Sequence, residues 1–157
     1  MKRFTLTILA VFAMLCSQVM ADDRVVAYEI VNGRSIPKSL TANPGDPEIG
    51  RRLYFDREIT GCSGCHGSPG GPGAQPNADA SNAPQLAGVA DRMDEGVLRL
   101  WLVAPQVMDP ETSMPAYYAV GQRSDENDPL YGSTRLSAAE IEALVAYLMR
   151  QKTETRP

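Results

Sequence analysis

Histidine, cysteine and basic residues are all scarce in this chain of 157 residues, which has one His and three Cys. Because there is a single histidine, the chain cannot contain both a Ser-His-Asp triad and a second site that needs a histidine. Acidic residues outnumber basic ones by 19 to 15, and such a chain lacks the basic surface that binds nucleic acid or anionic lipid. No internal repeat is visible, and no apolar run reaches the about 20 residues that cross a bilayer. One ordinary domain is expected, with no membrane insertion.

The first 21 residues have the layout of a secretory signal peptide. A short basic start containing Lys2 and Arg3 precedes an apolar run of 13 residues over 4–16, and Ala21 offers a cleavage position. Removing 21 residues from 157 leaves 136, with 13 basic residues (15 less two) against 19 acidic ones and a formal net charge of −6. We therefore expect an exported, periplasmic protein that is cleaved near Ala21.

The expected mature chain keeps two cysteines, and they belong to one motif. Its sequence is Cys62-Ser63-Gly64-Cys65-His66, and it includes the only histidine of the chain. Cys-x-x-Cys-His is the attachment site of c-type haem. One helical turn separates Cys62 from Cys65, so both thiols reach the two vinyl groups of one porphyrin. His66 then lies below the ring as the proximal iron ligand.

Two other interpretations of these cysteines are weaker. A structural zinc site needs four ligands, and the expected mature chain offers two Cys and one His. A thioredoxin-like redox pair would stand near a βαβ pattern, which is not evident here. We predict one haem c, attached through thioethers at Cys62 and Cys65.

The sixth iron ligand has to be a residue other than histidine. Met108 and Met114 share a segment between Pro105 and Pro115 that is predicted to be irregular. Met114 precedes a proline, which biases it toward an extended conformation and stiffens the loop. We predict Met114 as the ligand, with Met108 as the alternative. A His/Met iron has both axial positions filled, which favours electron transfer over substrate binding.

Three segments carry the signals of helices. Asp46-Pro47-Glu48 begins one that ends near Asp56, and a second begins near Asp94 and ends before Pro105. Ser137-Ala138-Ala139-Glu140 is a capping box, and the helix after it is predicted to run to about Gln151.

The remaining segments are predicted to lack helices. Residues 67–83 contain four Gly and three Pro, which indicates a loop. Residues 24–31 alternate and are followed by Asn32-Gly33, which favours a short hairpin or an extended arm. We expect an all-α protein with about three main helices, an N-terminal arm at 22–45 and a haem domain at 46–157.

This order of elements resembles that of the class I cytochromes c over about residues 46–151. The resemblance implies that the first and last helices cross closely, with Gly50 and Tyr147 at the contact. It also implies that the carbonyl of Pro84 accepts the N–H of the proximal imidazole of His66 and orients it. The alternative for Pro84 is an ordinary turn.

A narrower resemblance covers nearly the whole expected mature chain, including the arm. The sequence is similar to the SoxX family, the small haem subunits of the SoxAX cytochrome complexes of bacterial sulfur oxidation. The segments that carry this similarity lie on both sides of the haem motif, at 25–30, 36–41, 44–47, 98–100, 109–118 and 136–149.

The similarity to SoxX implies a role inside an enzyme, L-cysteine S-thiosulfotransferase. In that family thiosulfate is joined oxidatively to a cysteine of a SoxYZ carrier, and the bond forms at a haem of the partner SoxA. SoxX relays the electrons to a downstream cytochrome. Consistent with this, both cysteines of the expected mature chain would be thioethers and no second histidine is present. We assign no catalytic residue to this chain.

Two other functions remain open from the sequence. The first is a free periplasmic monohaem cytochrome c that carries electrons between complexes. The second is a haem-based sensor, which would need an open sixth site and is disfavoured by Met114. The arm before residue 46 favours a subunit, because it offers residues to wrap a partner. The alternatives are a solvated tail or a local cover for the haem edge.

Overall fold

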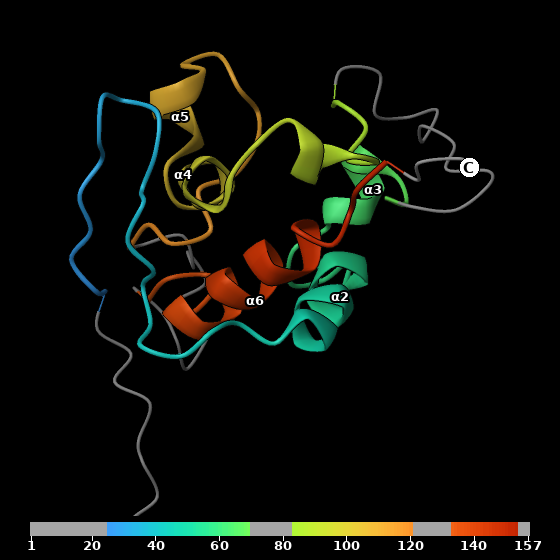
Figure 1. Ribbon diagram of the computed structural model, residues 1–157, viewed down its shortest axis with the longest axis horizontal. Helices are drawn as coiled ribbons and strands as arrows, with labels where there is room; N and C mark the ends of the chain where they lie inside the picture. Colours follow the sequence, from blue (N-terminus) through green and yellow to red (C-terminus); the bar gives the residue numbers. More distant parts are fainter. Residues whose placement is uncertain (1–24, 70–82, 121–132, 154–157) are drawn as a thin grey trace, which may run out of the picture.

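The computed structural model describes residues 25–69, 83–120 and 133–153. The predicted signal peptide and most of the Gly/Pro-rich loop lie outside these residues. In the described ranges the regular structure is helical and contains no strand (Figure 1). The all-α prediction is confirmed. The helices are α2 (Pro47–Phe55), α3 (Cys62–His66), the 3₁₀-helix η1 (Val89–Asp91), α4 (Glu95–Val103), α5 (Pro105–Met108) and α6 (Ala138–Leu148).

The starts of the three long helices follow from their capping residues. The Asp46 side chain accepts a hydrogen bond of 2.8 Å from the backbone N–H of Glu48 at the start of α2. Asp94 does the same for Val97 at the start of α4, at 2.9 Å. The predicted capping box is present before α6. These caps satisfy backbone donors that no preceding helical turn can satisfy.

The C-terminal helix is shorter than predicted. It ends at Leu148 and not near Gln151. Beyond it, the N–H of Arg150 donates to the carbonyl of Tyr147 at 3.1 Å and that of Gln151 to Leu148 at 2.9 Å. These bonds span three residues, so the chain tightens out of the α-helical pattern in its last turn.

Helices α2 and α6 cross at close range (Figure 1). A Cβ placed on Gly50 would lie 1.9 Å from the carbonyl oxygen of Ala143 and 2.8 Å from the Cβ of Tyr147. The two helix backbones therefore touch at this point, and only glycine leaves room for the contact. Beside it, the rings of Tyr54 and Tyr147 are in tilted contact, with centroids 5.5 Å apart and planes at 51° to each other.

The segment between α4 and the loop that carries Met114 is not wholly irregular. The prediction was wrong for Pro105–Met108, which forms the single-turn helix α5. Pro105 occupies the first turn, where its missing N–H removes no helical hydrogen bond. The N–H of Asp109 closes the turn on the carbonyl of Pro105 at 3.0 Å.

The arm before α2 is packed against the body of the protein. Its tight turn places Asn32 and Gly33 at φ of 53° and 64°, and a single antiparallel bridge joins Val31 to Ser35. Ile36 is fully buried, and its N–H donates to the carbonyl of Gly96 in α4 at 3.0 Å. Residues 25–45 are thus an extended, docked arm and not a solvated tail.

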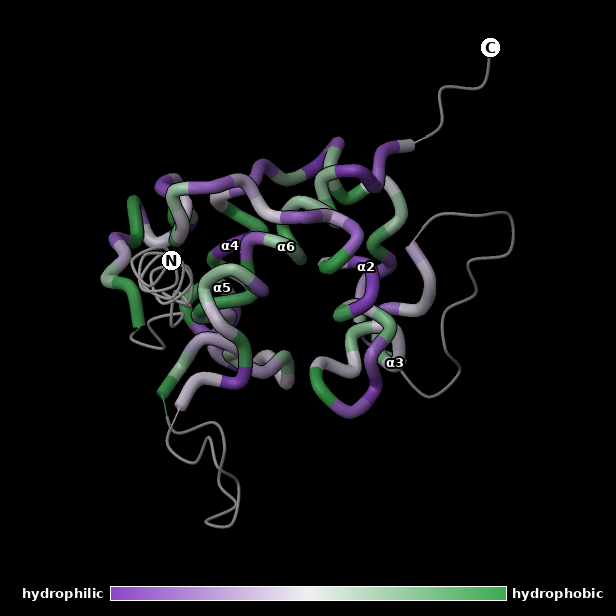
Figure 2. The backbone as a smooth tube through the Cα atoms, turned by 90° about the horizontal axis from the view of Figure 1, so that it is seen from below, coloured by the Kyte–Doolittle hydropathy of each residue, from purple (hydrophilic) through white to green (hydrophobic). Residues whose placement is uncertain are grey.

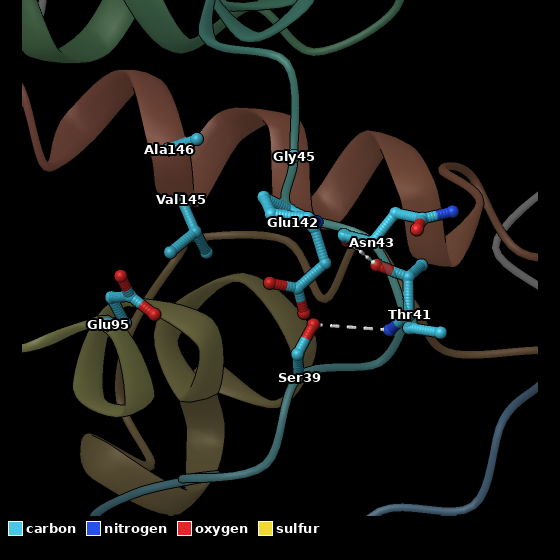
Figure 3. Close-up of a pocket in the computed structure, with 10 residues that line it drawn as sticks. Ser39, Thr41, Asn43, Gly45, Glu95, Glu142, Val145 and Ala146 are labelled. Carbon is cyan, nitrogen blue, oxygen red and sulfur yellow. Dashed lines mark hydrogen bonds between the residues drawn. The ribbon is translucent and has the colours of Figure 1, made fainter.

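A depression of about 340 Å³ with both polar and apolar lining residues lies where this arm crosses α6 (Figure 3). Ser39, Thr41 and Asn43 face it from the arm, and Thr41 donates to Ser39 and Asn43 at 3.2 Å and 2.7 Å. Glu95 and Glu142 line it from α4 and α6. Among the described helices none is long and apolar enough to span a membrane.

Candidate haem-binding site

The haem motif folds as the short helix α3. Gly61 precedes it and Gly67 follows it, each with a positive φ near 66–69° that favours glycine. Cys62 is buried and Cys65 is exposed, and no disulfide joins the two. A short helix of this sequence keeps both thiols within one turn, as the haem prediction requires.

The loop that leads into α3 is fixed by Asp56. The carboxylate accepts from the N–H groups of Glu58 and Ile59 at 2.9 Å and 2.8 Å. The backbone carbonyl accepts from Thr60 and Gly61 at 3.1 Å and 2.8 Å. With four donors satisfied by one residue, the chain turns sharply from α2 into α3 (Figure 2).

The imidazole of His66 is oriented by Pro84. Its Nδ1 lies 2.8 Å from the backbone carbonyl oxygen of Pro84. A carbonyl can only accept, so Nδ1 carries the proton and Nε2 keeps its lone pair. That tautomer leaves the Nε2 lone pair able to bind a metal. Histidine ligands of metals usually have their other ring nitrogen hydrogen-bonded to a second group, as Nδ1 is here.

The segment that carries Pro84 is itself held by Arg92, a residue that the sequence analysis did not identify. The guanidinium of Arg92 donates to the carbonyls of Gln85, Ala87 and Gly88 at 3.0, 2.9 and 3.0 Å. Three carbonyls that converge on one cation fix the local path of the backbone. Arg92 follows η1, and no motif in the sequence links it to residues 85–88.

The two candidate methionine ligands lie in different local structures. Met108 is the last residue of α5, and Met114 lies in the irregular segment after it. Both are half-buried and pack against the core. The backbone of Met114 is held on both sides, because its N–H donates to the Thr112 hydroxyl at 3.2 Å and its carbonyl accepts from the Gln106 side chain at 3.3 Å.

A buried tyrosine joins this segment to the haem motif. The hydroxyl of Tyr117 donates to the carbonyl of Thr60 at 2.6 Å and lies 4.0 Å from the Cys62 sulfur. Burial raises the pKa of the Cys62 thiol and of the Tyr117 hydroxyl. Sequence reasoning placed Tyr117 in the run after Met114 but had no local signal for its contact with Thr60.

The donor set fits a covalently held haem. It comprises two thiols on one helical turn, an imidazole whose Nε2 is available, and the segment that carries the thioether of Met114. The described residues contain no group of three or more His, Cys, Asp or Glu that could hold a metal ion by themselves. A zinc site therefore has no ligand set in the described part of the chain.

The class I cytochromes c have an all-α fold in which the short helix of the haem motif follows the first of two crossing helices. The family model described as "Cytochrome c" matches residues 47–152, so the chain belongs to the cytochrome c family. A haem electron-transfer role and covalently bound haem c follow from that membership.

Within that family the chain is SoxX-like. A chain of the crystal structure of SoxXA from P. pantotrophus is 30% identical to it, with a TM-score of 0.67. The match covers 80% of this chain and 95% of that chain. A search of curated proteins gave no match.

Proposed function

We propose that this chain is the electron-transfer haem subunit of a SoxAX-type complex in the periplasm. The substrate reaction joins the terminal sulfur of thiosulfate to a cysteine sulfur of a SoxYZ-like carrier. Formation of that S–S bond releases two electrons and the thiol proton. In this proposal the electrons enter the complex at a SoxA-like subunit, and the present chain passes them to a downstream cytochrome.

The observation that carries the proposal is the 30% identity to a chain of SoxXA, over a match that covers 95% of that chain. The 2.8 Å contact between His66 Nδ1 and the Pro84 carbonyl supports its haem-binding part. Bound haem c supplies a one-electron centre. The chain has to attach it and hold its axial ligands still, so that little structure changes between the two oxidation states. Cys62 and Cys65 would attach the group, His66, oriented by the Pro84 carbonyl, would bind its iron, and Met114 would supply the other protein ligand.

The chain itself carries no group suited to make the S–S bond. After both thioethers form, the expected mature chain has no cysteine left to act as a sulfur acceptor or a sulfur ligand. His66, the only histidine, is committed to the iron and has no part as a base. The proposed role is therefore that of a non-catalytic subunit.

Exposed apolar side chains on the arm favour a subunit over a free carrier. Val25, Val26, Tyr28 and Val31 lie within seven residues, and each is between 37% and 42% exposed. Apolar area left in water costs about 25 cal/mol per Å² relative to burial. We assign this stretch to contact with the SoxA-like haem subunit.

The test is the mass of the native periplasmic particle together with its covalent haems per chain. A stable particle with a second haem-bearing chain, whose haem is reduced by thiosulfate only when the SoxYZ-like carrier is added, supports the proposal. A single chain with one haem and no thiosulfate-dependent reduction supports the free carrier.

A pair of variants locates the contact. Tyr28→Asp on the arm should release the second chain and leave the haem content unchanged. Ile49→Asp provides a matched control, because Ile49 is 38% exposed but lies on α2. Loss of the second chain from both variants to the same extent, or its retention by both, would contradict the assignment of the arm.

A further inference from the structure

Tyr117 is held by three separate parts of the fold. Its N–H donates to the carbonyl of Leu102 in α4 at 2.9 Å, and its carbonyl accepts from the N–H of Leu136 before α6 at 2.9 Å. Its hydroxyl donates to the carbonyl of Thr60 at 2.6 Å. The residue is 3% exposed, so water does not compete for these bonds.

Thr60 is in turn rigidly placed beside the haem motif. Its N–H donates to the carbonyl of Asp56 at 3.1 Å, and its hydroxyl donates to the carbonyl of Leu53 in α2. It stands two residues before Cys62. The acceptor of the Tyr117 hydroxyl is therefore a fixed point of the segment that carries the haem thiols.

The donor of this hydrogen bond, Tyr117, lies close in sequence to Met114, the predicted iron ligand. Only Pro115 and Ala116 separate Met114 from Tyr117, and the ring of Pro115 restricts the backbone between them. With so short and stiff a link, the position of the Met114 backbone follows that of Tyr117. One hydroxyl thus joins the segment that attaches the haem to the segment that supplies its second axial ligand.

We propose that Tyr117 is a positioning residue that sets the strength of the Met114–iron bond. Its hydroxyl keeps the Met114 segment against the haem motif and lowers the fraction of molecules in which the sulfur has left the iron. This inference rests on the proposed ligation by Met114.

The neighbouring Tyr118 supplies a matched control. It is buried as well, and its hydroxyl also makes one hydrogen bond, accepting from the N–H of Val26 at 2.9 Å. That bond joins the segment to the arm and not to the haem motif. Tyr118→Phe therefore removes a partly buried hydroxyl hydrogen bond from the adjacent residue without touching Thr60.

The experiment compares ferric holoprotein of the wild type, Tyr117→Phe and Tyr118→Phe. Imidazole competes with the methionine sulfur for the iron, and its binding is followed by loss of the long-wavelength absorption band of a thioether-ligated ferric haem. A buried hydrogen bond of ordinary strength corresponds to about three- to tenfold in an equilibrium constant. We expect Tyr117→Phe to bind imidazole about three- to tenfold more tightly than wild type, and Tyr118→Phe to stay within about twofold of it.

Met114→Ala separates failure of this inference from failure of the proposed ligation. If Met114→Ala loses the absorption band and Tyr117→Phe binds imidazole like wild type, Tyr117 is not a positioning residue and the ligation stands. If Tyr118→Phe shifts imidazole binding as much as Tyr117→Phe, general loosening explains both and the inference is overturned. If Met114→Ala keeps the band, both the ligation and the inference are wrong.

Discussion

Arg99 of α4 and Glu142 of α6 form a buried ion pair in the core, with two hydrogen bonds of 2.7 and 2.9 Å between guanidinium and carboxylate. Their side chains are 1% and 5% exposed. The arm contributes two further hydrogen bonds: Arg99 also donates to the carbonyl of Ile36 at 2.6 Å, and Glu142 accepts from the N–H of Leu40 at 2.8 Å. The exposed carboxylate of Glu95 lies 3.7 Å from the same guanidinium. The pair therefore connects two helices and the arm.

Removing one charge of this pair should be strongly destabilising. Glu142→Gln leaves the guanidinium of Arg99 with only the exposed carboxylate of Glu95, 3.7 Å away, as a counter-ion. The expected loss in the free energy of unfolding is about 3 kcal/mol, the low end of the about 3–5 kcal/mol for breaking a buried pair. Glu48→Gln is the control, because Glu48 pairs with Arg150 at 3.0 Å while both side chains are exposed. Its expected loss is about 0–1 kcal/mol. Urea unfolding measures both, and equal losses would contradict the structural role of the buried pair.

Gly50→Ala should disrupt the crossing of α2 and α6. The added Cβ would lie 1.9 Å from the carbonyl oxygen of Ala143, so the helices have to separate. Overpacking of this kind costs about 1–3 kcal/mol, and contact with backbone places the expected loss at the upper end. Gly64→Ala serves as the control, because nothing lies within 4 Å of its added Cβ. Thermal unfolding of the two variants should differ clearly, with Gly64→Ala close to wild type.

Local signals explain which elements the sequence predicts well. Asp46, Asp94 and the Ser137 capping box each bond to a residue at most three positions away. The start of a helix can therefore be predicted from the sequence alone. The partners Arg99 and Glu142 are 43 residues apart, and no local pattern joins them. Helix α5 was not predicted because it is a single turn that begins at Pro105 and ends two residues before Pro110.

The same distinction holds for the haem site. Cys62, Cys65 and His66 form one contiguous motif whose chemistry is evident from its spacing. Pro84 was predicted through resemblance to a family, and the structure places its carbonyl 2.8 Å from the His66 ring. Arg92 and Tyr117 act on carbonyls brought near by folding, and a carbonyl carries no sequence signature.

Substitution of each methionine tests whether Met114 or Met108 is the second protein ligand of the iron. Met114→Ala should keep covalent haem but lower the reduction potential, by a part of the about 0.8 V range that axial ligands cover. Loss of the thioether removes the ligand that raises the potential, and it opens the iron to exogenous ligands. Potentiometric titration measures the effect. An unchanged potential in Met114→Ala with a lowered one in Met108→Ala would transfer the role to Met108.

Attachment of the haem should require both thiols for full yield. Cys65→Ser leaves at most one thioether, and we expect a clear loss of holoprotein measured as covalent haem per chain by intact mass. Ser63→Ala, between the two cysteines, should retain the wild-type yield. Wild-type yield in Cys65→Ser would contradict c-type attachment at this motif.

Stability should fall in alkaline solution because of two buried tyrosines. Burial raises the pKa of Tyr54 and Tyr117 above the ordinary value of 10.0. The unfolded chain then loses these protons near pH 10 while the folded protein keeps them, so stability is unaffected below that pH and declines above it. Urea unfolding on either side of pH 10 tests the sign. Tyr54→Phe should flatten the decline, and an equally steep decline in that variant would contradict its cause.

The crossing of α2 with α6 also imposes an order in time on the folding of this chain. Glu48 in α2 and Arg150, two residues after α6, share a hydrogen bond and are 102 residues apart, so these contacts close a long loop and form slowly. Residues 62–66 are synthesised well before Tyr117 and α6. The attachment motif therefore exists as an open segment for the whole interval before the chain can close. Under the proposed attachment of haem at Cys62 and Cys65, the Cys62 thiol is most accessible in that interval, because it is buried once the two helices have packed.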